Sequence, residues 1–156
     1  MDSPSAGSHS ARWGFSVSRP EDEVAIVVAG HGDFALGLAS AVDLIIGPQH
    51  NFAAVCLSAE ESPSDFLARL RQTIEDIDSG AGVVVLVDLP GATPFSTAAR
   101  IAYERRGVEV IGGVNLPMVL EALVRRQGRR LDDLVKIMAE AGPAGIIRWS
   151  PPSEET

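Results

Sequence analysis

The chain has 156 residues, of which 46% are hydrophobic, and this size favours one domain with one core over two domains. Its formal net charge of -8 opposes attraction to nucleic-acid phosphates and to anionic lipid, so we expect neither nucleic acid nor a membrane as a partner. No apolar run approaches the roughly 20 residues that span a bilayer, and the N-terminus lacks the pattern of a secretion signal.

The two ends of the chain have the composition of tails. Residues 1–22 are rich in Ser, Gly and Arg without a sustained period, so we expect a disordered N-terminal extension in which His9 has no role. Residues 150–156 predict a C-terminal tail, which leaves 23–149 as the domain. The single cysteine, Cys56, lies in an apolar run and predicts a buried, inert thiol.

Short runs of β-branched and aliphatic residues alternate with longer segments of helical spacing, which is typical of βαβ units around a parallel sheet. Each run is continuously apolar or nearly so, as expected when helices cover both faces of the sheet. The sequence therefore predicts an α/β, single-domain, flavodoxin-like parallel sheet with helices on both faces. The four predicted strands are Val24–Ala29, Phe52–Leu57, Val83–Val87 and Val108–Ile111.

The helical segments carry recognisable start and stop signals. The first is predicted to end at Gly47-Pro48, and the second to begin with Ser62 as a cap and Pro63 at the first helical position. The first should turn one apolar face to the sheet, made of Phe34, Leu38, Ala41, Val42 and Ile45. The second should bury Phe66, Leu70, Ile74 and Ile77.

Three further helices and one more strand complete the predicted order. A third helix is predicted from Thr93, a fourth from about Asn115 and a fifth over Leu131–Ala141. Gly142-Pro143 then predicts a stop, and Ala144–Trp149 is interpreted as a last strand whose direction the sequence leaves open.

The basic runs and His50 are interpreted as solvated residues without a role in chemistry. Basic residues gather at 105–106 and 125–130, and we interpret them as solvated helix ends, with a docking surface for an acidic partner as the alternative. His50 lies in a predicted turn and is interpreted as a solvated loop residue. No second histidine or carboxylate stands at metal-ligand spacing, so we expect no bound metal.

Gly30-His31-Gly32 lies where the first predicted strand ends and the first helix begins. Such a junction presents backbone N–H groups and a positive dipole end to an anion, so His31 and the backbone of Gly32 are candidates for phosphate chemistry. Taken alone, however, the tripeptide favours a turn histidine.

Asp88 directly follows the predicted strand Val83–Val87. In a flavodoxin-like order, the first and third strands are neighbours, which puts His31 and Asp88 on the same edge of the sheet. A carboxylate bonded to one ring nitrogen fixes the tautomer and leaves the other nitrogen as a nucleophile. A turn or cap role for Asp88 is equally open.

Thr93 has two compatible interpretations. Its hydroxyl would hydrogen-bond a phosphoryl oxygen, whereas its position before Pro94 favours an N-cap. The sequence contains no Gly-x-Ser-x-Gly elbow, P-loop or dinucleotide fingerprint, so we expect no hydrolase triad and no nucleotide cofactor.

Five segments, in order, resemble the mannose-family enzyme IIA component of the bacterial sugar phosphotransferase system, over about residues 23–148. They are Ala25–Gly32, Leu36–Ala41, Ile46–Gln49, Val87–Phe95 and Gly113–Met118. The chain departs from the family's Gly-Gly-Thr/Ser-Pro-x-Asn at Ala92 and Ser96. Because a positive φ at Ala92 would be strained, we predict an ordinary backbone angle there.

The resemblance implies a cytoplasmic phosphotransferase that works without a cofactor. His31 would accept a phosphoryl group from the phosphocarrier HPr and pass it to an enzyme IIB component for sugar uptake, with Asp88 orienting the ring and Thr93 lining the phosphate pocket. It also implies a homodimer in which the strand Ala144–Trp149 joins the partner's sheet. The alternatives are a regulatory IIA protein that serves no transport, and a noncatalytic or dihydroxyacetone-kinase-coupled domain.

Overall fold

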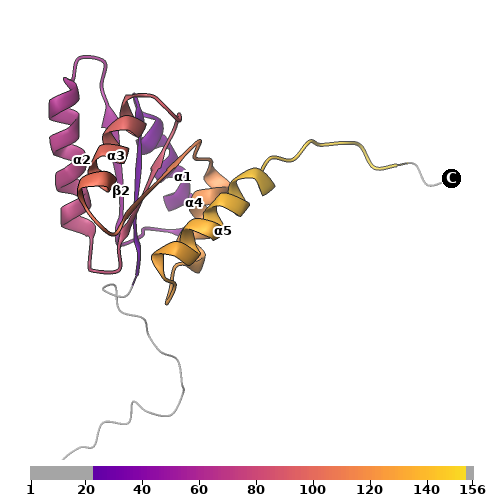
Figure 1. The fold of residues 1–156 in the computed structure, drawn as a ribbon. Helices are drawn as coiled ribbons and strands as arrows, with labels where there is room; N and C mark the ends of the chain where they lie inside the picture. Colours follow the sequence, from indigo (N-terminus) through magenta and orange to yellow (C-terminus); the bar gives the residue numbers. More distant parts are fainter. Residues whose placement is uncertain (1–22, 154–156) are drawn as a thin grey trace, which may run out of the picture.

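The computed structural model describes residues 23–153 (Figure 1). Strands and helices alternate along most of this range, as the hydrophobic pattern predicts. The elements are β1 (Ala25–His31), α1 (Phe34–Ile46), β2 (Phe52–Leu57), α2 (Pro63–Ile77), β3 (Val83–Val87), α3 (Thr93–Glu104), β4 (Val108–Gly112), α4 (Leu116–Arg125) and α5 (Leu131–Ala144). None of the helices in this range is long and apolar enough to cross a membrane.

The strands form one parallel sheet in the order β2-β1-β3-β4. This order confirms the predicted flavodoxin-like arrangement, in which β1 and β3 are neighbours although β2 lies between them in sequence. After β2 the chain crosses over β1, so that β3 is added on the other side of β1. The carboxyl ends of β1 and β3 are therefore adjacent at the topological switch point, where α/β proteins bind their ligands.

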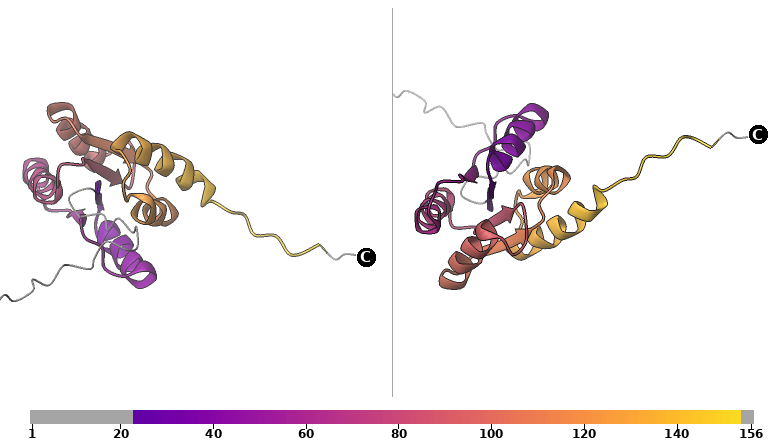
Figure 2. Two further views of the ribbon diagram at one scale, coloured as in Figure 1. Left: turned by 90° about the horizontal axis from the view of Figure 1, so that it is seen from below. Right: turned by 90° about the horizontal axis from the view of Figure 1, so that it is seen from above.

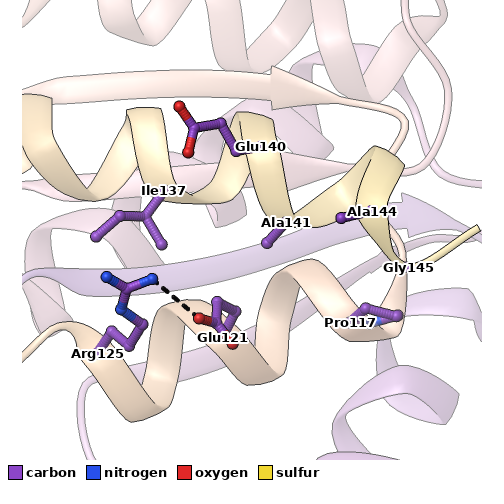
Figure 3. Close-up of a pocket in the computed structure, with 8 residues that line it drawn as sticks. All are labelled: Pro117, Glu121, Arg125, Ile137, Glu140, Ala141, Ala144 and Gly145. Carbon is purple, nitrogen blue, oxygen red and sulfur yellow. Dashed lines mark hydrogen bonds and ion pairs between the residues drawn. The ribbon is translucent and has the colours of Figure 1, made fainter.

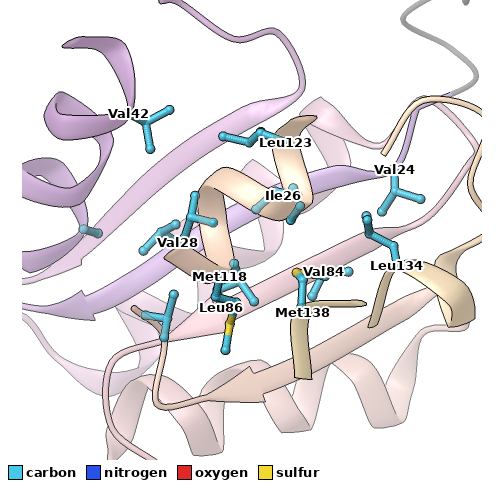
Figure 4. Close-up of a cluster of buried hydrophobic side chains, with 14 residues drawn as sticks. Val24, Ile26, Val28, Val42, Val84, Leu86, Met118, Leu123, Leu134 and Met138 are labelled. Atoms are coloured by element: carbon cyan, nitrogen blue, oxygen red, sulfur yellow. The ribbon is translucent and has the colours of Figure 1, made fainter. Parts of the chain in front are cut away.

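Helices cover both faces of the sheet, as predicted (Figures 1 and 2). Successive strand residues point to opposite faces, so each central strand contributes to two separate cores. One core lies between the sheet and helices α1, α4 and α5, and its strand residues are Ile26, Val28, Val84 and Leu86. Figure 4 shows these side chains in one cluster with Met118, Leu134 and Met138. The alternate residues Val27, Val85 and Val87 pack against Phe66 and Leu70 of α2 and Ile101 of α3.

Two of the predicted helix starts are capped by side chains, and the cap at Ser62 is the one that the sequence predicted. Ser62 Oγ accepts a hydrogen bond from the N–H of Asp65 at 3.1 Å, with Pro63 following as the first helical residue. Asn115 Oδ1 accepts from the N–H of Met118 at 3.0 Å, and its amide also donates to the Gly142 carbonyl at 2.7 Å. Asn115 thereby ties the start of α4 to the last turn of α5.

The C-terminal segment differs from the prediction. Helix α5 continues through Gly142-Pro143 to Ala144, because a proline in a last turn loses only one intrahelical bond. Residues 145–149 form no strand in this chain, and the arm of residues 145–153 runs away from the body beyond α5 (Figure 1). Its side chains Ile146, Ile147 and Trp149 are exposed.

Two burial predictions were also inaccurate. Only Ala35 and Val42 of α1 are fully buried, while the predicted core positions Phe34 and Ile45 are exposed. The helix is apolar nearly all round, so sequence period alone could not select the face that packs. Cys56 is only partly buried, because β2 is an outer strand of the sheet.

Arg126, predicted to be a solvated helix end, is instead buried with 2% of its side chain exposed. Its guanidinium donates to the carbonyls of His50 at 2.6 Å and Asn51 at 3.0 Å, and its Nε lies 3.3 Å from Glu23 Oε2. A longer bond reaches the Val24 carbonyl. Burial lowers the pKa of Arg126, and the charge of Glu23 acts in the opposite direction. The side chain thus joins the end of α4 to the amino-terminal edges of β1 and β2.

Replacing Arg126 with Met should therefore destabilise the protein strongly. The apolar side chain fills similar space but takes the donor from buried carbonyls and breaks the ion pair with Glu23 by removing only one of its members, which typically costs about 3–5 kcal/mol. Urea unfolding measures the loss. The matched variant Arg125→Met removes only the exposed pair with Glu121, so its free energy of unfolding should fall by less than about 1 kcal/mol. Equal losses in the two variants would contradict the structural role of Arg126.

Candidate functional site

The carboxyl edge of the sheet brings His31 and Asp88 together, as the strand order predicted. His31 is the last residue of β1, and Asp88 follows the last residue of β3. The two strands pair in parallel with Ala29 opposite Val87, and the N–H of Asp88 donates to the Ala29 carbonyl at 3.2 Å. The sheet register therefore sets the separation of the two side chains.

One carboxylate oxygen of Asp88 holds His31 in two ways. Asp88 Oδ2 lies 2.8 Å from the ring Nδ1 of His31 and accepts the backbone N–H of the same residue, also at 2.8 Å. Oδ1 accepts the N–H of Leu89 at 2.8 Å. The His31 side chain is 48% exposed and that of Asp88 only 14%. The ring is thus fixed at Nδ1 by a shielded carboxylate while the imidazole itself remains open to an approaching group.

The environment keeps the Asp88 carboxyl ionised. Its burial raises the pKa, but the hydrogen bonds from the His31 backbone, the His31 ring and the Leu89 backbone together lower it by more. The pKa of Asp88 therefore lies below its ordinary value of 3.8. An ionised carboxylate accepts a hydrogen bond from Nδ1–H, which leaves the lone pair on Nε2.

Gly30 is favoured at this position by the close approach of two side chains. A Cβ there would lie 3.0 Å from Asp88 Oδ2 and 3.0 Å from Phe34 Cδ1, so any side chain would push the carboxylate away from His31. The Gly-His motif is visible in the sequence. The steric reason for a glycine at residue 30 is visible only in the structure, because it depends on Asp88 at the end of the neighbouring strand β3.

Two adjoining cavities, of about 720 and 350 Å³, open beside His31 and share Thr93 as a lining residue. The N-cap of α3 is Ala92, not Thr93 as predicted, because Thr93 already has helical geometry. Within residues 23–153 the Thr93 hydroxyl has no hydrogen-bond partner, and it lies at the positive end of the α3 dipole. Ala92 has φ -87° and Gly91 +79°, which confirms the unstrained angle predicted for Ala92.

Other candidate residues lie elsewhere or are already engaged. The Gly32 N–H donates to the Leu57 carbonyl at 2.9 Å, so it is not a free donor for a phosphate. His50 is exposed as predicted, at the opposite edge of the sheet, and its Nε2 lies 2.8 Å from Glu23 Oε2. His9 is outside the described residues. Ser64 of α2 and Arg100 of α3 line the larger cavity, and no local sequence pattern marked them.

A separate groove of about 400 Å³ lies between α4 and α5 (Figure 3). Its polar side chains are Glu121 and Arg125, paired at 3.0 Å, and Glu140. Its lining residues include no histidine, cysteine or serine. Across residues 23–153 no cluster of three or more His, Cys, Asp or Glu side chains suits a metal ion.

Comparison with known proteins points to one family. The family model described as "PTS system fructose IIA component" matches residues 25–139, a range that includes both His31 and Asp88. The fructose-specific EIIA component of Bacillus subtilis is 33% identical over 112 residues, which are 72% of this chain and 77% of that protein.

Two further relatives extend this similarity. The mannose-specific EIIAB component of Escherichia coli K12 is 32% identical over 124 residues, which are 79% of this chain but only 38% of that longer protein. Among solved structures, the phosphotransferase system component EIIA of Streptococcus agalactiae has a TM-score of 0.75 at 30% identity, covering 80% of this chain and 96% of its own.

The lowered pKa of Asp88 predicts a specific pH dependence of stability. Above pH 3.8 the carboxyl is ionised in both folded and unfolded chains, and its full contribution is present; below that value the unfolded chain gains a proton first, so the contribution declines. The Asp88→Asn protein lacks this titration. Urea unfolding from about pH 7 to about pH 3 should therefore show a stability difference between the two proteins that shrinks at the acid end. A difference independent of pH would contradict the assigned hydrogen bonds.

Proposed function

The chain belongs to the mannose-type enzyme IIA family of the bacterial sugar phosphotransferase system, and we propose that within this system His31 carries the phosphoryl group. The observation that carries the proposal is the 2.8 Å contact between His31 Nδ1 and Asp88 Oδ2 beside an open cavity. The chain supplies an oriented, exposed imidazole and its sequence has no nucleotide fingerprint, which supports another phosphorylated protein as the proposed donor.

The transfer is a displacement at phosphorus. The Nε2 lone pair of His31 attacks the phosphorus of the incoming phosphohistidine, the donor's N–P bond breaks, and a new N–P bond forms on His31. Asp88 holds Nδ1–H throughout and stabilises the positive charge that develops on the ring as Nε2 bonds to phosphorus. The second transfer reverses these steps toward an acceptor protein.

The phosphoryl oxygens need donors on the other side of the ring. Thr93 offers a hydroxyl with no partner among residues 23–153, and the first turn of α3 offers backbone N–H groups that have no intrahelical acceptor. Pro94 at the second helical position lacks an N–H, so the donors come from Thr93 and Phe95. This arrangement supports Thr93 as a phosphate-binding residue.

We assign the flanking partners from family membership: HPr as donor and an enzyme IIB component as acceptor, with sugar phosphorylation as the outcome. The E. coli relative is named an EIIAB component, and this chain spans 38% of its length. We also propose a homodimer, because β4 is an outer strand of the sheet and the exposed apolar arm of residues 145–153 is available to join a partner's edge.

Incubation with phosphoenolpyruvate, enzyme I and HPr should add one phosphoryl group per chain, labile to acid and stable to alkali. Intact mass and phosphopeptide mapping measure the product. The His31→Gln protein should take up none, and His50→Gln, which changes the other described histidine, should be labelled like the wild type. Phosphate found on His9, His50 or a serine would exclude His31 as the carrier.

Replacing Asp88 with Asn should slow the transfer from phosphorylated HPr by at least about tenfold, or roughly 1.4 kcal/mol of barrier. Asn keeps the size of the side chain but removes the charge that orients and stabilises the ring. Rapid-quench kinetics give the rate, and circular dichroism checks the fold. A wild-type rate would show that Asp88 is only a turn residue.

A further inference from the structure

The loop between β2 and α2 forms one wall of the smaller cavity beside His31. Ser58, Ala59 and Glu61 of this loop line the cavity together with His31 and Thr93. Among the lining residues, all of which lie within residues 23–153, Glu61 is the one carboxylate. Its side chain is 11% exposed. In the proposed function, the cavity beside the phosphoryl group therefore has an acidic side chain on its wall.

Arg69 of α2 binds both oxygens of the Glu61 carboxylate. Its Nε donates to Oε1 at 2.6 Å, and its Nη2 donates to Oε2 at 2.8 Å. The hydrogen bonds from Arg69 lower the pKa of Glu61, and those to Glu61 raise the pKa of Arg69, so both side chains are charged at neutral pH. The negative charge of Glu61 is thus compensated by a bidentate partner.

The same arginine ties the loop to the strands that hold His31. Its Nη2 also donates to the Cys56 carbonyl at 2.6 Å, near the end of β2. The next residue, Leu57, accepts the N–H of Gly32, and the Glu61 N–H donates to the Ser58 carbonyl at 3.2 Å. These bonds set the position of the Glu61 carboxylate relative to the end of β1.

The charge of this wall matters because phosphorylation is itself a large change of charge. A phosphoryl group carries about -1.5 to -2 at neutral pH. A spherical cavity of 350 Å³ would be about 9 Å across, and the screening length is about 10 Å in 0.1 M salt, so charges on its walls act on one another. A carboxylate without its partner would oppose phosphorylation of His31, whereas the pair with Arg69 is neutral overall.

We propose, on the basis of the function proposed above, that Arg69 is a positioning residue for phosphotransfer that acts through Glu61. It fixes the wall of the cavity and cancels the negative charge of that wall where the phosphoryl group arrives. The equilibrium between the donor and His31 is thereby shifted toward phosphorylated His31.

A direct role for Glu61 is the competing interpretation. A free carboxylate beside His31 would attract a cationic side chain of the donor protein. Both Glu61 oxygens are already bound by Arg69, which favours compensation over recruitment. A merely structural role is the other alternative, but exposed ion pairs contribute little to stability, and the Arg69 side chain is 52% exposed.

The test measures the equilibrium constant for transfer from phosphorylated HPr to the full chain, by intact mass after enzyme I has been removed. In 0.1 M salt, Arg69→Gln should lower this constant at least about threefold, and the loss should shrink as the salt approaches 1 M. Adding Glu61→Gln to Arg69→Gln should restore the constant to within about twofold of wild type, because the uncompensated charge is gone. Arg69→Lys, which keeps the charge, should stay within the same range.

The matched control is Arg125→Gln, with circular dichroism checking the fold of every variant. It changes the net charge by the same amount and leaves the Glu121 carboxylate unpaired on α4, so it should keep the wild-type constant. An unchanged constant for Arg69→Gln would overturn the proposal, and so would a double variant as impaired as Arg69→Gln, since the role would then be structural. A lower constant for Glu61→Gln alone would overturn it in favour of a direct role for Glu61. Absence of label on wild-type His31 would instead reject the proposed function itself.

Discussion

The bond between His31 and Asp88 is the constraint on which the site depends. A single carboxylate oxygen accepts both the backbone N–H and the ring nitrogen of one histidine, so it fixes the end of β1 and the orientation of the imidazole together. This is possible only because β1 and β3 are adjacent and parallel, and because Gly30 carries no side chain to separate them. The charge of Asp88 is maintained by the same hydrogen bonds that it accepts.

The rest of the sheet supplies the rigidity that this bond needs. Both faces of β1 and β3 are buried under helices, so neither strand can shift its register without moving a core. At the opposite edge, the buried guanidinium of Arg126 joins the amino-terminal ends of β1 and β2 to the end of α4. The reactive edge of the sheet can therefore be open to solvent while the remainder of each central strand is enclosed.

The surroundings of His31 are divided chemically. On one side, α3 contributes the Thr93 hydroxyl and the positive end of a helix dipole, which suit a phosphoryl group. On the other side of the ring, Phe34 of α1 is an exposed apolar side chain.

The sequence by itself determined the strands and helices of an α/β parallel sheet, the position of His31 and Asp88 after the first and third strands, and the cap Ser62, since these follow from local hydrophobic period and turn residues. Tertiary structure alone decided the burial of Arg126, the face of α1 that packs, and Ala92 rather than Thr93 as the α3 cap. A run of basic residues at 125–130 predicts solvent exposure for each of them. Arg126 is buried because carbonyls of residues distant in the sequence accept its hydrogen bonds. An evenly apolar helix carries no signal for its own orientation, because only the neighbouring sheet determines which side is covered.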